Sequence, residues 1–230
     1  VLLTVPDDAI DPVCRDLAEA NAFTEGAVVA HCSGALGSDV LAPAKQRCGC
    51  DIGSMHPLQT FPTTEAALDR LPGAYCFCEG DDRAVEMLEE LARSIGATPA
   101  RIDAGAKAIY HAAAVTACNS LTTLIDAAVT MCAEAGIDRE IALAALGPLS
   151  KATLESVAAM GPAGALTGPV ARGDAGTVRR HLEALGACDE KLQALYRAAG
   201  IWTADLAERK GTLDRAAAAA LTDLLRSERN

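Results

Sequence analysis

The chain has 230 residues, half of them hydrophobic and only 3% aromatic, and its formal charge at pH 7 is −11. This length allows two domains with a sizeable core, and the acidic balance excludes an extended surface that follows nucleic-acid phosphates. The longest apolar segment is interrupted by Asn119, Asp126 and several threonines. It therefore falls short of the roughly 20 continuous apolar residues of a membrane span, and no membrane partner is predicted.

The nine cysteines lie mostly in apolar runs, with no signal peptide ahead of them. Reduced thiols in a cytoplasmic protein are therefore expected. Two C-x-C pairs, Cys48/Cys50 and Cys76/Cys78, raise the possibility of a zinc site, but structural zinc sites use wider spacing. Residues i and i+2 of a strand share a face, so Cys76 and Cys78 are interpreted as small core residues. No metal is predicted.

The first half of the chain alternates between apolar strand-like runs and helical patterns. Strands are predicted at 1–5, 26–33, 51–56, 74–79 and 98–103. Helices are predicted between them, at 7–21, 37–47, 64–71 and 81–96. This alternation indicates an α/β fold with a mostly parallel sheet and helices on its faces.

The second half contains no further strand pattern. A long alanine-rich helix is predicted at 106–135, ended by Gly136. More helices are predicted at 138–160, 174–186, 187–199 and 202–227. We therefore predict two domains, an α/β domain at 1–103 and an all-α domain at 104–230.

The helix at 106–135 is apolar almost all the way round. A surface helix would carry one polar face, so this helix is expected to be covered on every side. In a chain of this size the cover is expected to include a second copy, which predicts a homodimer.

No G-x-G-x-x-G dinucleotide fingerprint occurs in the sequence, and the nearest stretch, "SGALGSD" at 33–39, lacks its spacing. A different signal comes from "HCSG", in which a buried strand ends at Ser33 and Gly34. Open α/β sheets bind ligands at the carboxyl ends of their strands. A ligand-binding turn and an ordinary tight turn remain equal alternatives here.

The strand in "SMHPLQTF" (54–61) ends in the same way. His56 precedes Pro57 and is followed by Gln59 and Thr60. A lone histidine is most often a structural residue, but polar side chains at one sheet edge can converge. We predict that His56, Gln59 and Thr60 contact a substrate.

Polar residues also interrupt the start of the long helix, in "KAIYHAAAVTACN" (107–119). Lys107 and His111 are four residues apart and share a face, and Asn119 lies two turns further on. Polar groups on an apolar helix need partners, which a cleft between the two halves would provide. The alternative is that His111 and Asn119 satisfy each other or nearby backbone groups.

In "LTGPVARGDAGTV" (166–178), Asp174 precedes a predicted helix with Thr177 three residues on, the pattern of a helix N-cap. Arg172 has two interpretations. It pairs with Asp174, or it lies in the cleft and binds a carboxylate or phosphate of the substrate.

Five motifs, "VPDDAI", "HCSGALGSDVL", "MHPLQTF", "YHAAAVTACN" and "LTGPVARGDAGTV", occur in this order between Val1 and about Leu185. Together they resemble an uncharacterised family in which a Rossmann-like domain is joined to a DUF2520 domain. That family is similar to the 6-phosphogluconate dehydrogenase superfamily, which includes β-hydroxyacid dehydrogenases, prephenate dehydrogenase, pyrroline-5-carboxylate reductase and ketopantoate reductase.

The resemblance implies a partial Rossmann-like domain followed by an all-α domain of the 6-phosphogluconate dehydrogenase C-terminal type. Members begin with a β-α-β unit that carries the glycine fingerprint, so "VLLTVPDDAI" looks like their fourth strand, and the first part of the nucleotide domain is expected upstream of it. The resemblance also implies an NAD or NADP cofactor lying along Val5, Pro6 and Asp7 and along Ser33 and Gly34. NAD and NADP are not distinguished.

The sequence departs from this superfamily at one position. In the β-hydroxyacid dehydrogenases a catalytic lysine lies four residues before an asparagine, whereas Val115 lies four before Asn119 here. His111, a residue type whose ordinary pKa is near the working pH, could transfer the proton instead, or Lys107 could reach in from two turns before Val115. We predict His111, Lys107 and Asn119 as the catalytic set.

Two functions are compatible with these features. The first is an NAD(P)-dependent oxidoreductase that transfers a hydride between nicotinamide and a small carbonyl, imine or hydroxy compound in the interdomain cleft. The second is a non-catalytic dinucleotide-binding or redox-sensing module, which the absent lysine makes a reasonable alternative.

Overall fold

The computed structural model describes residues 1–227 and divides into two compact units. The first unit is Val1–Leu121, and the second begins at Thr122. The division falls inside the long helix α5 (Lys107–Glu134), which contributes its first half to one unit and its second half to the other. The last strand ends before this helix, at Arg101, close to the predicted change from α/β to all-α structure.

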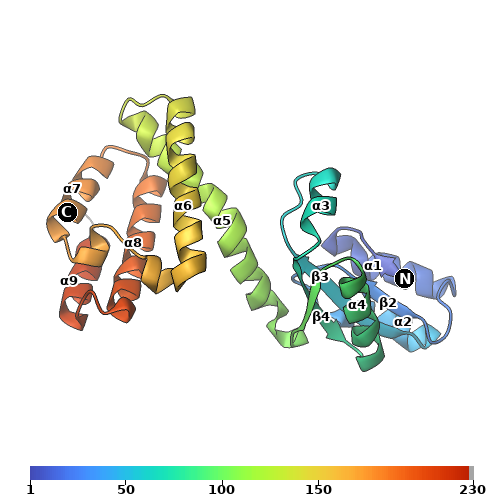
Figure 1. Ribbon diagram of the computed structural model, residues 1–230. Helices are drawn as coiled ribbons and strands as arrows, with labels where there is room; N and C mark the ends of the chain where they lie inside the picture. Colours follow the sequence, from blue (N-terminus) through green and yellow to red (C-terminus); the bar gives the residue numbers. More distant parts are fainter. Residues whose placement is uncertain (228–230) are drawn as a thin grey trace. The chain divides into compact units, whose positions relative to one another are not determined.

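The first unit contains a five-stranded sheet whose strands follow one another in chain order (Figure 1). The strands are β1 (Leu2–Leu3), β2 (Val28–His31), β3 (Asp51–Leu58), β4 (Tyr75–Gly80) and β5 (Thr98–Arg101). All neighbouring pairs are parallel except β3 and β4. The connection between these two holds only the short helix α3 (Thr64–Arg70), which buries no residue and does not cross the sheet. The sheet is therefore mostly parallel, as predicted.

Helices cover both faces of this sheet. Helices α1 (Asp7–Glu19) and α2 (Ala42–Cys48) share one core cluster with Leu3, Val29 and Ile52. Helix α4 (Asp82–Ser94) shares a second cluster with the strand residues of opposite parity. These are Ala30, Met55, Cys76 and Cys78.

The prediction for the C-x-C pair in β4 is confirmed. Cys76 and Cys78 are fully buried in the core beneath α4, and all nine cysteines are free thiols. Burial raises the pKa of Cys78 to about 12, so this thiol stays protonated and apolar at neutral pH.

The second unit is helical. It contains the end of α5, then α6 (Arg139–Ala165), α7 (Ala175–Leu185), α8 (Glu190–Lys210) and α9 (Arg215–Arg226). One predicted boundary is confirmed and another is wrong. The helix predicted to end at 160 is broken at Gly161, where φ is +72° and the backbone is not helical, and a short helical segment then runs on to Ala165.

The wrong boundary is the predicted break between 199 and 202. Gly200 lies inside α8, because Leu225 of α9 packs against it so closely that a Cβ there would lie 2.9 Å from a Leu225 methyl group. The helix ends instead at Gly211, where φ is +80°, and Asp214 then caps α9 by accepting from the Ala217 amide. Glycine was needed for close helix packing at the first position and for a left-handed turn at the second.

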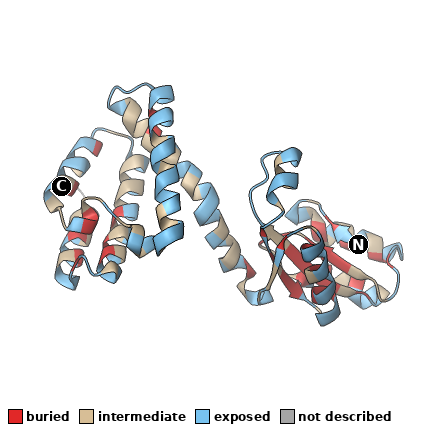
Figure 2. Cartoon of the chain, in the orientation of Figure 1, coloured by how far each residue is buried: buried red, intermediate tan, exposed pale blue. Residues whose placement is uncertain are grey.

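The expectation that the long helix is covered on every side is not met within one chain. Much of α5 and α6 is exposed or half-exposed (Figure 2). The segment Ala104–Glu134 has a mean hydropathy of 1.3 over its most apolar window, of which 11% is buried. By length and composition this one helix could cross a membrane, a test that core helices of other proteins also pass.

Candidate active site

The candidate site lies at the carboxyl ends of β1, β2 and β3, which meet at one edge because these strands are parallel. A turn follows β2, and His31 holds it in place. The buried His31 ring accepts from the Ser33 amide through Nδ1 and donates through Nε2 to the Gly37 carbonyl, both at 3.1 Å. Burial lowers the pKa of His31, which favours this neutral form. His31 was not predicted to be part of the site.

Ser33 joins this turn to the start of α1. Its hydroxyl donates to the Asp7 carboxylate at 2.7 Å and accepts from the Ala35 and Leu36 amides at 3.1 and 3.0 Å. The two segments predicted to lie along a cofactor, Val5–Pro6–Asp7 and Ser33–Gly34, are therefore adjacent. The first turn of α1 carries Asp7 and Asp8, so its negative charge does not suit a pyrophosphate group.

Two histidines meet at Gly34. His56 lies near the end of β3 and His111 in the second turn of α5, and their ring centroids are 5.7 Å apart with the rings nearly perpendicular, at 82°. A Cβ at Gly34 would lie 2.8 Å from His56 Nε2 and closer still to His111 Nδ1. Only glycine lets both imidazoles pack against the turn.

The two histidines differ in their hydrogen bonding. His56 Nδ1 bonds Tyr110 Oη at 2.8 Å, whereas His111 Nδ1 is buried and has no hydrogen-bond partner within residues 1–227. Burial, together with the neighbouring His111 and Lys107, lowers the pKa of His56 to about 4. Burial also raises the pKa of Tyr110 to about 12. At neutral pH, His56 is therefore uncharged and Tyr110 keeps its proton.

A cavity of about 670 Å³ opens beside this pair, within the first unit. It is lined by His56, Leu58, Gln59, Thr60, Phe61, Phe77, Tyr110, His111, Ala113, Ala114, Val115, Ala117, Cys118 and Asn119. Five residues predicted to act on a substrate thus surround one space, which no lysine, arginine, aspartate or glutamate lines. Its size and apolar lining are typical of small-molecule sites.

Lys107 and Glu79 lie outside this cavity, in a buried polar network. The Lys107 ammonium is 1% exposed and donates to the Ser33 carbonyl at 2.8 Å and to the Ser54 hydroxyl. Glu79 Oε1 is 3.8 Å from it. Burial lowers the pKa of Lys107, and the nearby Glu79 acts in the opposite direction. The network accounts for how a lysine predicted to be catalytic is held in the interior.

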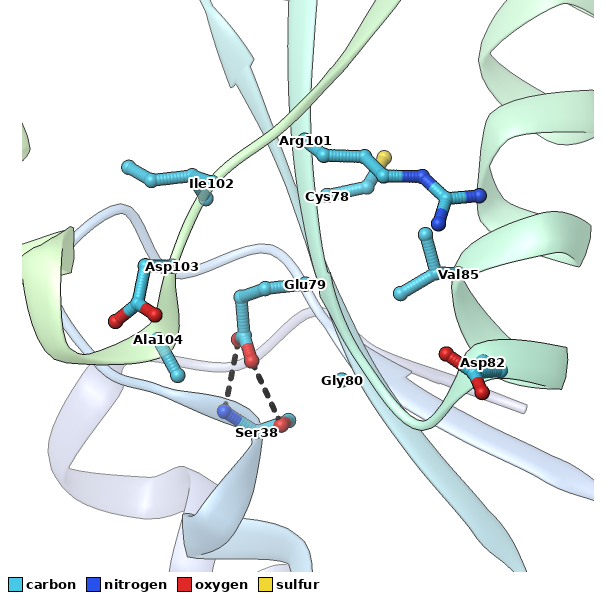
Figure 3. A pocket seen from close by; sticks show the side chains of 10 residues that line it. All are labelled: Ser38, Cys78, Glu79, Gly80, Asp82, Val85, Arg101, Ile102, Asp103 and Ala104. Atoms are coloured by element: carbon cyan, nitrogen blue, oxygen red, sulfur yellow. Dashed lines mark hydrogen bonds between the residues drawn. The ribbon is translucent and has the colours of Figure 1, made fainter.

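A second cavity, of about 380 Å³, lies over Glu79, between Ser38 and the segment 101–104 (Figure 3). Figure 3 shows the Glu79 carboxylate accepting from the backbone amide and the hydroxyl of Ser38, both at 2.8 Å. Its carboxylate is therefore occupied by protein donors. No group of three or more histidine, cysteine, aspartate or glutamate residues in the described chain could hold a metal ion.

Arg172 belongs to the second unit. It is exposed and ends the short helix η3 (Val170–Arg172). The predicted N-cap is confirmed two residues later, where Asp174 accepts from the Thr177 amide at 2.9 Å and from its hydroxyl at 2.7 Å. The proposed contact between Arg172 and a substrate stays a prediction.

Comparison with known families gives two matches. Residues 1–57 match a Rossmann-like domain, and residues 74–203 match a domain of unknown function, DUF2520. No curated protein matches the sequence.

Three solved structures are similar in fold. Protein TM1727 from Thermotoga maritima is 27% identical, with a TM-score of 0.76 over 92% of this chain and 79% of that one. The "putative NADP oxidoreductase BF3122" from Bacteroides fragilis is 23% identical, with a TM-score of 0.68 over 86% and 72%. Pyrroline carboxylate reductase from Plasmodium falciparum, solved with NADP bound, is 13% identical, with a TM-score of 0.54 over 97% and 78%. At 23% and 13% identity, the similarity to the last two structures shows a shared fold alone.

Proposed function

The chain belongs to the DUF2520 domain family, and on that premise we propose that it is a nicotinamide-dependent oxidoreductase acting on a small carbonyl, imine or hydroxy compound. The observation that carries the proposal is the buried, unpaired Nδ1 of His111, which lies beside a neutral histidine on the wall of an apolar cavity. A buried polar atom without a partner is costly unless a ligand completes it.

The nicotinamide end of a dinucleotide would lie along Val5–Pro6–Asp7 and the Ser33–Gly34 turn. Two observations support this assignment: these segments are bonded to each other, and the unpaired His111 Nδ1 faces the same turn. When bound, the cofactor supplies or accepts the hydride. The solved relatives described with NADP support a nicotinamide cofactor, but NAD and NADP remain equal alternatives.

The residues of the chain would handle the proton. His111 Nδ1 would give a proton to the substrate oxygen or nitrogen in the reducing direction and take it back in the reverse. Tyr110 would donate a hydrogen bond from its hydroxyl to His56 Nδ1, which leaves the proton of the neutral His56 ring on Nε2 as a hydrogen-bond donor. Gln59, Thr60 and Asn119 would orient the substrate, and the apolar wall would exclude water.

The test is NADH and NADPH oxidation with a panel of ketones, keto acids and imines, for the chain and for His111→Ala. We expect turnover to fall about 10²–10⁴-fold in this variant, as for loss of a general acid. The control is His181→Ala, because His181 belongs to the second unit, does not line the cavity beside His111, and has its Nδ1 bonded to the Tyr196 hydroxyl at 2.8 Å. Dinucleotide binding without oxidation of any substrate would support the alternative of a non-catalytic module.

We also propose that the protein is a homodimer that pairs through α5 and α6. Helix α6 has 27 residues, of which only Ala142 is buried. Its large apolar side chains are exposed, including Ile141 at 64%, Leu149 at 62% and Met160 at 60%. An apolar face of this length on a helix with four charged residues is typical of a surface that a partner covers. A second copy would bring the same apolar face, which makes the pairing self-complementary.

A further inference from the structure

The buried Lys107 network touches the three chain segments that carry Gly34, His56 and His111. The Lys107 ammonium binds the carbonyl of Ser33, the residue before Gly34. It also binds the hydroxyl of Ser54, which lies two residues before His56 on the same face of β3. Finally, Lys107 itself lies four residues, about one helical turn, before His111 in α5.

The geometry leads us to propose that Lys107 is a positioning residue, whose buried ammonium fixes the segments of Gly34, His56 and His111 relative to one another without touching substrate. This proposal rests on the proposed function only for the expected effect on turnover. The arrangement of the two imidazoles is a property of the folded chain and can be measured separately.

The charge of Lys107 is held in place by a defined set of donors and acceptors. Ser54 accepts from the ammonium and donates to Glu79 Oε1. Glu79, 4% exposed, also accepts from the amide and hydroxyl of Ser38 (Figure 3). The carboxylate therefore has three protein donors besides the ammonium, and the pair is buried with its hydrogen bonds satisfied. Removing one partner alone would leave an uncompensated charge.

The close packing at Gly34 makes the positions of both histidine rings depend on the position of the Ser33–Gly34 turn. His56 Nε2 and His111 Nδ1 both lie against the Gly34 backbone, so a shift of the turn moves the surface on which both rings rest. Without the ammonium, the Ser33 carbonyl would lose its side-chain donor, and the start of α5 would lose its hydrogen bond to Ser54 of β3. Catalytic groups displaced by about 1 Å can lose on the order of 10² in rate.

The deciding variant is Lys107→Met, with Lys107→Met/Glu79→Gln as the companion in which no buried charge is left unpaired. The ring nitrogens of the histidines are observed by ¹⁵N NMR of the full chain. We expect the His56 and His111 resonances to shift in both variants and kcat to fall by up to about 10²-fold. If neither variant folds, the same resonances are measured in Ser54→Ala, because this substitution removes one of the two hydrogen-bond acceptors of the ammonium.

The matched control is Lys210→Met. Lys210 also donates two hydrogen bonds, here to the carbonyls of Gly164 at 3.1 Å and Leu166 at 2.7 Å, and it belongs to the second unit. A general loss of stability would affect this variant without moving the His56 and His111 resonances. Unchanged resonances in a folded Lys107→Met chain would overturn the proposal. If the resonances were unchanged but kcat fell, Lys107 would act on the substrate directly. If the parent chain had no activity, the proposed function would fail, and the resonances would still decide the role of Lys107.

Discussion

The hydroxyl of Ser33 donates a 2.7 Å hydrogen bond to the carboxylate of Asp7, across two segments that are 26 residues apart in the sequence. This bond connects the end of β1, through the first residue of α1, to the turn after β2. The same hydroxyl accepts from two backbone amides of the turn. One small side chain thus sets the shape of the sheet edge at which the candidate site lies.

Replacing Ser33 with alanine should therefore destabilise the first unit. The change leaves the Ala35 and Leu36 amides without their side-chain acceptor, at a cost of about 1–3 kcal/mol in the free energy of unfolding. Urea denaturation measures it. The control is Ser94→Ala, an exposed serine bonded only to the Leu91 carbonyl, which should change stability by less than about 0.5 kcal/mol. Equal effects of the two substitutions would contradict the assigned role of Ser33.

Replacing Gly34 with alanine should displace both histidines. The backbone φ of Gly34 is not positive, so alanine is not strained there by its conformation, and the effect comes from contact with the two rings. We expect a loss of about 1–3 kcal/mol from overpacking, together with shifted His56 and His111 ring resonances. Gly176→Ala is the control, because a Cβ there meets its nearest neighbour at an ordinary 3.5 Å. Unmoved histidine resonances in Gly34→Ala would be evidence against the close packing.

The stability of the chain should fall as pH drops below neutrality. The folded state holds the pKa of His56 at about 4, whereas an unfolded histidine titrates near 6.5. Between these values the unfolded chain binds the extra proton, so the stabilisation is present above about pH 6.5 and is lost toward pH 4, by up to about 3 kcal/mol. Buried His31, with its lowered pKa, acts in the same direction.

Urea denaturation from pH 7 to 4, on the chain and on His56→Asn, separates these two contributions. His31 remains in both proteins, so the difference between their curves belongs to His56. The His56→Asn curve should be flatter by up to one proton, about 1.4 kcal/mol per pH unit. Parallel curves would show that His56 is not held neutral by the fold.

Much of the first unit could be predicted from the sequence because its strands are short apolar runs separated by helical patterns. The convergence of His56 and His111 was also predictable in outline, since His56 lies near the end of a strand and His111 lies near the start of the helix that follows the sheet. The antiparallel pairing of β3 with β4 was not, because it depends on whether the connecting helix α3 packs on the sheet. No local pattern in 59–74 decides that.

The polar interior of the site was missed for a different reason. The period of two places Ser54 and His56 of β3 on one face, but it gives no sign that Glu79 of β4 and Lys107 of α5 lie against that face. Lys107 was expected to reach a substrate, because an isolated lysine on a helix gives no sign that a buried carboxylate and two acceptors lie beneath it. Its burial follows only from contacts between four separate elements.

The last prediction concerns the exposed apolar face of α5 and α6. Leu149→Glu places a charge where the side chain is 62% exposed in the single chain, so the fold of one unit should survive while association with a second copy weakens. Ala127, which spacing alone would allow to face a partner, is only 8% exposed and is unsuitable, since a charge there would disrupt its own unit. Leu68→Glu is the matched control, 71% exposed on α3 of the first unit.

Sedimentation at micromolar concentration distinguishes the outcomes. We expect a dimer for the parent chain and for Leu68→Glu, and a shift toward monomer for Leu149→Glu, because burying an unpaired carboxylate in an apolar interface costs several kcal/mol. A parent chain that sediments as a monomer would contradict the proposed pairing. Recovery of the parent chain only in the presence of detergent would instead indicate that lipid covers this face, since the segment Ala104–Glu134 is long and apolar enough to cross a membrane.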